Sequence, residues 1–268
     1  GLIGLTALQL GALRILIAAV FLFIIGFKSL KNIQLKDWKW ITLSAFLGTF
    51  FPAFLFAYGI TEIDSAIAAI LNSTTPLLTF LLGLAFFGVV FAKTQFLGVI
   101  IGLSGTVLLI ISGASLNPNQ NYWFALLPLF ASLMYGFNAN IIKYHLHKIS
   151  PLGIAVSSFV VLTIPTLCVL IYSGFFEEEI LTSRETWTSF LYVTILAVLG
   201  TGLAKVLFNK LIHISTAVVA SSVTYLIPIV AFLWGYWDGE KFSWFQLASA
   251  GIILIGVYLA NKKFPSRE

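Results

Sequence analysis

Residues 47–56 read LGTFFPAFLF, and residues 199–208 read LGTGLAKVLF. The two stretches share Leu-Gly-Thr at the start and Leu-Phe at the end, and the step from 47 to 199 is 152 residues. The same step pairs Pro76 with Pro228. Because a fixed register that keeps glycine and proline is hard to obtain by chance in apolar sequence, the pattern predicts an internal repeat.

The composition places this repeat in a membrane. Of the 268 residues, 59% are hydrophobic and 9% are charged, and the mean hydropathy is +1.01. Continuous apolar runs of about 20 residues can cross a bilayer as helices, whereas a β-barrel would require shorter, alternating segments. The sequence therefore predicts an all-α integral membrane protein with nine visible spans: 5–27, 38–60, 65–91, 94–113, 122–143, 151–174, 188–211, 215–237 and 243–261.

Charged residues between the spans give the orientation. Basic residues gather at one set of helix ends and acidic residues at the other, and the basic side is cytoplasmic by the positive-inside rule. This predicts a multi-pass protein of the plasma membrane, the inner membrane of a bacterium, with a cytoplasmic C-terminus. The net charge of +5 then reflects topology, not nucleic-acid binding. Basic residues assigned to the cytoplasm include Lys28, Lys31, Lys39, Lys143, Lys148, Lys210 and Lys262, and acidic residues assigned to the outside include Glu62, Asp64, Glu177, Glu178 and Asp238.

Matching segments of the two copies of the repeat carry opposite charge. The basic segment 28–39 corresponds to the acidic segment 177–187, so matching helices must face opposite sides. An odd number of helices per repeat produces this inversion, which is common in secondary transporters. Two repeats of five helices would require ten, and we expect the first helix of the parent protein to be missing before Gly1. The predicted division is a first repeat at 1–113, a second at 120–261 and a cytoplasmic tail at 262–268.

Several motifs together resemble a known superfamily. TTPLLTFLLG at 74–83, YLIPIVAFLWG at 225–235, ALR at 12–14 and DGE at 238–240 look like the drug/metabolite transporter superfamily, and within it the EamA-like family. The resemblance implies ten helices in two inverted five-helix repeats. The sequence departs from the family pattern at 88–90, where Gly-Val-Val stands in place of a Gly-Glu pair.

The resemblance implies a secondary transporter that exports small amphipathic metabolites such as amino acids by alternating access. A transporter of phosphorylated or nucleotide-linked solutes is the alternative within the superfamily, and it would require two or more cations in its cavity. An intramembrane enzyme or a structural membrane protein represents other classes. An enzyme would require clustered acid, base or metal-binding groups inside the helices, so we expect no catalytic residue, cofactor or metal.

Two proline-containing helices supply the first candidates for solute binding. Proline removes a helix hydrogen bond and kinks the helix, which exposes backbone groups to a solute near mid-membrane. The competing interpretation is that the nearby hydroxyls bond to carbonyls of their own helix or pack between helices. The candidates are Asn72 and Thr75 beside Pro76, and Ser221 and Tyr225 ahead of Pro228.

Four further candidates come from other helices. Tyr135 and Asn138 are three residues apart and share a helix face, where they either contact solute or join helices. Arg14 and Lys205 are cations within apolar spans, which is a functional hypothesis by default. Arg14 has either a structural role or a role in the cavity. Lys205 either extends to the headgroups at the cytoplasmic mouth or lies in the transport path.

Helix packing and partners complete the expectations. Gly98 and Gly102 form a GxxxG motif, for which close packing within the chain is favoured over a homodimer seam. His145 and His147 have no further ligands near them in sequence, which favours a solvated loop over a metal site. The expected partners are the lipid bilayer and a small-molecule solute, with a homodimer as an open possibility and no nucleic acid.

Overall fold

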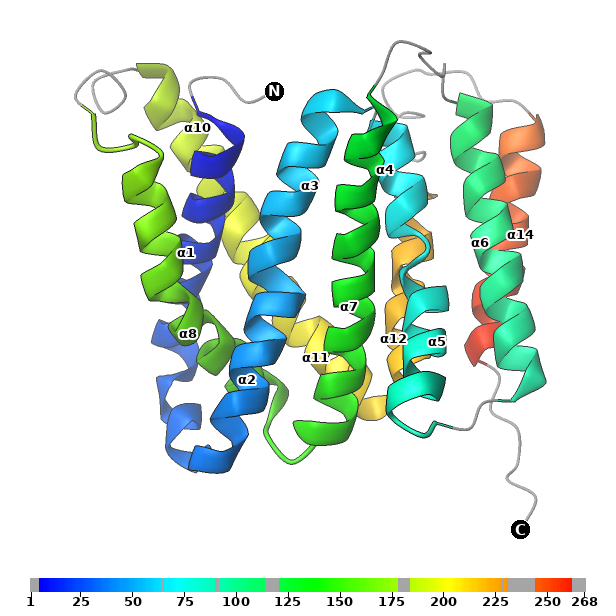
Figure 1. Cartoon of the computed structure of the whole chain (residues 1–268), viewed down its shortest axis with the longest axis horizontal. Helices are drawn as coiled ribbons and strands as arrows, with labels where there is room; N and C mark the ends of the chain where they lie inside the picture. The colour runs from blue at the N-terminus through cyan, green and yellow to red at the C-terminus, as the bar shows by residue number, and fades with distance from the viewer. Residues whose placement is uncertain are drawn as a thin grey trace. The chain divides into compact units, whose positions relative to one another are not determined.

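The structure is a computed structural model that describes residues 5–63, 65–89, 92–113, 121–177, 184–227, 229–230 and 244–261 (Figure 1). These ranges contain helices and no strand, so the fold is all-α. The elements, in chain order, are α1 (Ala7–Gly26), η1 (Phe27–Asn32), η2 (Leu35–Asp37), α2 (Trp38–Ala45), η3 (Phe46–Phe50), α3 (Phe51–Glu62), α4 (Ser65–Asn72), α5 (Thr75–Phe86), α6 (Lys93–Gly113), η4 (Tyr122–Ala125), α7 (Leu126–His145), α8 (Pro151–Tyr172), α10 (Arg184–Ile195), η5 (Leu196–Leu203), α11 (Ala204–Ile214), α12 (Ala217–Ser221), η6 (Ser222–Tyr225) and α14 (Trp244–Asn261).

The described helices include several that are long and apolar enough to cross a membrane. Six qualify by length and composition, and two shorter apolar helices lie at Lys93–Leu109 and Leu247–Ala260. The remaining expected span, 215–237, extends beyond the described residues. The chain is a multi-pass membrane protein. The six long helices are Ala7–Asn32, Leu35–Glu62, Ala68–Phe86, Trp123–His145, Pro151–Tyr172 and Ser189–Ile214.

The chain forms two compact units, each built from both halves of the sequence. Unit 1 comprises residues 1–58 and 141–214, and unit 2 comprises residues 59–140 and 215–268. Two of the three boundaries fall inside α3 and α7, and the third falls between α11 and α12. The division predicted from the sequence follows the repeat, whereas the packing interleaves the two halves.

In unit 1, α1 packs along α8 (Figure 1). Thr6 caps α1 in a reciprocal bond pair with Gln9, and the Gln9 amide also donates to the Ser173 carbonyl at 3.0 Å, at the end of α8. At the other end of α1, a Cβ on Gly26 would lie 2.5 Å from the Val156 side chain. The missing side chain at Gly26 therefore lets the two helices approach closely.

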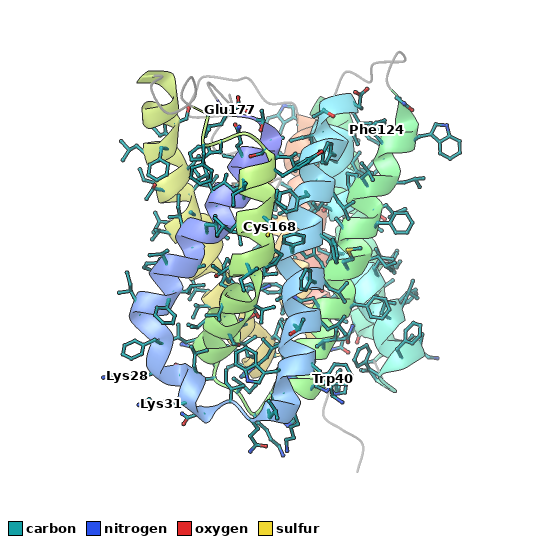
Figure 2. All side chains as sticks on the ribbon, turned by 60° about the vertical axis from the view of Figure 1, so that its left-hand side comes forward. Lys28, Lys31, Trp40, Phe124, Cys168 and Glu177 are labelled. Carbon is teal, nitrogen blue, oxygen red and sulfur yellow. The ribbon has the colours of Figure 1, made fainter. Side chains whose placement is uncertain are left out.

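The two ends of unit 1 carry the opposite charges that the orientation rule uses. Lys28, Lys31 and Trp40 lie at one end and Glu177 at the other, with Cys168 between them (Figure 2). At the basic end, the Trp40 ring stacks on His145 with centroids 3.6 Å apart and planes within 3°. The ends assigned from sequence to the cytoplasm and to the outside are thus opposite ends of this unit.

In unit 2, α6 packs along α14 (Figure 1). A Cβ on Gly98 would overlap the Ala260 backbone nitrogen, and one on Gly256 would overlap the backbone of Gly102. The GxxxG face of α6 is therefore covered by a helix of the same chain, the interpretation that the sequence favoured.

Candidate solute-binding site

The repeated Leu-Gly-Thr motif adopts the same irregular backbone in both copies. Residues of η3 and η5 form π-helical segments, in which the Phe51 N–H bonds to the Phe46 carbonyl and the Ala204 N–H bonds to the Leu199 carbonyl, five residues back. Such wide turns are rare within α-helices and are frequent at functional sites. The motif that reveals the repeat thus also marks an interruption in each copy.

Lys205 connects the second copy of the motif to the first. Its ammonium donates to the Gly48 carbonyl of η3 at 3.0 Å, within unit 1. Ala53 occupies the matching position in the first copy and packs beside an apolar cluster of α1 and α8. The repeat is therefore asymmetric here, because lysine bonds to the motif glycine in one direction and alanine cannot do so in the other.

Arg14 reaches the second copy from α1. Its guanidinium Nη2 donates to the Thr201 hydroxyl at 3.2 Å. Thr201 precedes Lys205 by four residues, so both intramembrane cations are tied to the η5–α11 segment. Thr49, the first-copy counterpart of Thr201, has a buried hydroxyl oxygen with no hydrogen-bond partner among the described residues. Unit 1 thus brings Arg14 and Lys205 to one segment.

The helix of unit 2 that contains Pro76 is interrupted. α4 ends at Asn72 and α5 begins at Thr75, with Pro76 in its first turn. Since proline has no N–H, the Asn72 carbonyl lacks its usual helical donor, and the Thr75 hydroxyl donates to it at 2.7 Å instead. The Asn72 side-chain Oδ1 is buried and has no hydrogen-bond partner within the ranges that the structure describes. At this interruption, the side-chain amide oxygen of Asn72 is therefore a candidate to accept a hydrogen bond from a solute.

α7 binds both sides of this interruption through a stripe that the sequence analysis missed. The Ser132 hydroxyl shares its one proton between the Pro128 carbonyl of its own helix at 2.9 Å and the Leu71 carbonyl at 3.1 Å. The Asn140 amide donates to the carbonyls of Thr79 and Gly136, each at 2.9 Å. Ser132, Gly136 and Asn140 recur every four residues, which places them on one helix face. That spacing of small and polar residues is the signal that could have identified the stripe.

The other candidates of unit 2 differ in environment. Tyr135 is half-buried and Asn138 is 1% exposed, both on α7. The Ser221 hydroxyl donates to the Val218 carbonyl at 3.0 Å, within its own helix. Tyr225 is fully buried, its hydroxyl donates to the Val99 carbonyl at 3.0 Å, and its ring packs against Gly102 of α6.

Pro228 lies outside the described residues. Within the ranges that the structure covers, no three His, Cys, Asp or Glu side chains are grouped so that they could hold a metal ion. The candidate residues supply amides and hydroxyls that can form hydrogen bonds, and in unit 1 also the cations of Arg14 and Lys205.

The apolar spans and the interrupted helices of the described residues define a polytopic membrane protein. Residues 2–111 and 122–262 match the model of the EamA-like transporter family. The chain belongs to the EamA-like transporter family, as its motifs predicted.

Two relatives are themselves named as transporters. The uncharacterized inner membrane transporter YedA of Escherichia coli K12 is 29% identical over 201 residues, which is 75% of this chain and 63% of that protein. The uncharacterized transporter YdfC of Bacillus subtilis 168 is 27% identical over 265 residues, which is 96% of this chain and 82% of YdfC. The match to YedA thus spans less than two thirds of the relative's length.

A solved crystal structure shares the fold. It superposes with a TM-score of 0.74 at 17% identity, covering 96% of this chain and 87% of that chain.

Proposed function

We propose that the protein is a secondary transporter that moves small amphipathic metabolites, such as amino acids, out of the cell by alternating access. Family membership and the names of the two relatives support transport over catalysis or a purely structural role. The name of YedA supports the inner membrane as its location. The substrate class and the outward direction rest on the resemblance.

One structural observation supports this proposal above the others, namely the interruption between α4 and α5. A break in the hydrogen bonding of a helix is tolerated at membrane depth only where protein or a water-filled path covers it. At this break, the Asn72 amide oxygen is buried and has no hydrogen-bond partner in the part of the chain that the structure describes. A polar solute group that donates to this oxygen would satisfy it during transport.

The chemistry of the other candidate residues of unit 2 suggests a role for each in binding solute or in stabilising a helix. Tyr135 offers an aromatic face and a hydroxyl to an apolar group with a polar end, and Asn138 offers a second amide on the same face of α7. Thr75 stabilises the interruption through its bond to the Asn72 carbonyl. Ser221 and Tyr225 stabilise α12 and η6 through their bonds to main-chain carbonyls.

Reconstitution tests the proposal. The full-length protein in liposomes, and in cells that overproduce it, is screened for uptake and efflux of amino acids, other metabolites and toxic analogues. Mass spectrometry of the accumulated solute distinguishes transport, which leaves it unchanged, from catalysis. Empty liposomes and cells without the protein are the baseline. Accumulation equal to this baseline for every solute, from protein that is correctly folded, would refute the proposal.

Asn72→Ala and Tyr135→Ala test the assignment of the residues. We expect each to lower the transport rate at least about tenfold at equal expression, because a solute hydrogen bond or an aromatic contact is lost. Ser104→Ala is the matched control, since Ser104 is an exposed residue of α6 that bonds only to its own helix in the described structure. Variants of Asn72 and Tyr135 that transport as well as Ser104→Ala would contradict these roles.

A further inference from the structure

We propose that Lys205 is a positioning residue that replaces the main-chain donor removed by Pro52, and that its bond to Gly48 favours one of the two access states of the transporter. We call this bond, from the Lys205 ammonium to the Gly48 carbonyl, the latch. The inference rests on the proposed alternating-access function and concerns the balance between its states, whatever the solute.

The first observation is a main-chain carbonyl in unit 1 that lacks its usual donor. In an α-helix, the Gly48 carbonyl would accept a hydrogen bond from the N–H of residue 52, and residue 52 is proline, which has no N–H. Gly48 and Pro52 are both buried, so water has little access to this part of the helix. Leaving a buried carbonyl without a partner costs free energy comparable to a lost hydrogen bond. Pro52 therefore creates a need for a donor from outside its own helix.

The second observation is that Lys205 meets this need. Its ammonium donates to the Gly48 carbonyl at 3.0 Å, and the two residues belong to the same unit although 157 positions separate them in the chain. A hydrogen bond from a charged donor is stronger than one between neutral groups, and it also reduces the cost of a cation within an apolar span. The carbonyl and the ammonium thus each relieve a cost that the other would carry alone.

The third observation is that the two copies of the repeat differ at both positions, in a complementary way. With the step of 152 residues, Ala204 corresponds to Pro52, and Lys205 corresponds to Ala53. Ala204 retains its N–H, which bonds within its own segment. The alanine side chain at position 53 has no polar atom with which to bond to the second copy. The first copy has lost a main-chain donor and the second has gained a side-chain donor, so the latch exists in one direction only.

This one-way bond has a consequence for alternating access. In transporters built from inverted repeats, access alternates as one repeat moves against the other, and the two states exchange the arrangements of the copies. An arrangement inverted relative to that of unit 1 would require a donor at Ala53 for the carbonyl of Gly200, and alanine has none. A contact that is made in one state shifts the population toward that state. The latch therefore favours the arrangement seen in unit 1 over its inverse.

A double-mutant cycle tests the pairing of Pro52 with Lys205 without requiring transport. The readout is thermal unfolding of the purified full-length protein in detergent. Pro52→Ala restores an N–H to the helix, so the Gly48 carbonyl no longer depends on lysine. We expect Lys205→Met to lower Tm by about 4–8 °C more in the parent chain than in the Pro52→Ala chain, because a buried carbonyl loses its donor only in the parent. Any effect of removing a charge from the bilayer is common to both chains and cancels in the comparison.

Two further variants control this cycle. Lys210→Met makes the same replacement at an exposed lysine of α11 and should shift Tm equally in both chains. Lys205→Arg retains N–H donors and should unfold near the parent Tm. If Lys205→Met does not fold in the parent chain, Pro52→Ala should restore its folding.

Cysteine labelling tests the latch itself. In a Cys168→Ser background, Thr49→Cys places a thiol next to Gly48, where the Thr49 hydroxyl oxygen is buried. We expect Lys205→Met to speed maleimide labelling of this thiol about tenfold, as for the loss of one charge-assisted hydrogen bond. The increase should persist in the Pro52→Ala, Lys205→Met double variant, because its helix is repaired but its latch is absent. If Lys205 only stabilised the fold, labelling would return to the parent rate in the double variant.

Four results would overturn the inference. They are an equal effect of Lys205→Met on Tm in both chains, a Lys205→Met protein that Pro52→Ala does not restore to folding, labelling that Lys205→Met leaves unchanged, and labelling that returns to the parent rate in the double variant. Any of them in a protein that transports solute would leave the transporter standing and remove the latch. A coupled cycle with persistent labelling, in a protein that transports nothing, would keep the latch and remove the proposed function.

Discussion

Alanine in place of glycine at two positions of α14 should change stability in opposite directions. A Cβ at Gly256 would overlap the backbone of Gly102 and lie 2.9 Å from the Gly98 carbonyl oxygen. A Cβ at Gly251, five residues earlier on the same helix, would meet no described atom within 4 Å. The two variants thus make the same chemical change with and without a steric conflict.

The magnitudes follow from two competing terms. Alanine is favoured over glycine within a helix by roughly 0.5–1 kcal/mol, and this gain applies at both positions. Overpacking costs about 1–3 kcal/mol, and we take the upper value at Gly256 because the obstructing atoms are backbone and cannot rotate away. We therefore expect Gly256→Ala to lower the free energy of unfolding by about 2 kcal/mol, and Gly251→Ala to raise it by roughly 0.5–1 kcal/mol.

The assay is thermal unfolding of the purified protein and both variants in the same detergent. With a shift of about 2–4 °C per kcal/mol, Tm should fall by about 4–8 °C for Gly256→Ala and rise by about 1–4 °C for Gly251→Ala. Equal shifts, or a Gly256→Ala protein as stable as the parent, would refute direct backbone contact between α6 and α14.

Three other predictions concern single residues. Asn140→Ala should lower the free energy of unfolding by about 2 kcal/mol, because the hydrogen bonds from the Asn140 amide to the carbonyls of Thr79 and Gly136 are lost. Denaturant titration measures this change, and an unchanged midpoint would contradict it. Lys143→Met should speed hydrogen exchange at the end of α11, measured by mass spectrometry, because the ammonium donates there to the carbonyls of Ile212 and His213; unaltered exchange would show that the bonds are unimportant. In a Cys168→Ser background, an impermeant maleimide applied to intact cells should label Glu177→Cys and spare Lys28→Cys, and the reverse result would invert the orientation.

The sequence was sufficient for the class of protein and for the family. Apolar runs of bilayer length can form only helices or closed barrels, so composition and run length lead directly to an all-α membrane protein. The motifs TTPLLTFLLG, YLIPIVAFLWG, ALR and DGE resemble those of the EamA-like family, and the family match confirms this prediction. These features are local in sequence and require no knowledge of which helices touch.

The stripe of Ser132, Gly136 and Asn140 on α7 was not predicted from the sequence. Asn140 is fully buried and bonds across to α5, yet Tyr135 and Asn138 were selected from that helix because their chemistry suits a solute. In an apolar helix, every face looks suitable for burial, and the sequence does not show which face meets another helix. Tyr225 illustrates the same limit, since its hydroxyl bonds to the Val99 carbonyl of a helix more than a hundred residues away in the chain.

The sequence by itself determined the repeat, the helical membrane class, the family and the identity of the two intramembrane cations, because each depends on composition or on spacing along the chain. Only the tertiary structure decided the backbone conformation and the contacts of the repeated LGT motif. It made both LGT motifs π-helical, and it joined Lys205 to Gly48 and Arg14 to Thr201 across separations of 157 and 187 residues. Contacts at such separations depend on how helices pack, and packing is set by the shapes of all the surfaces together.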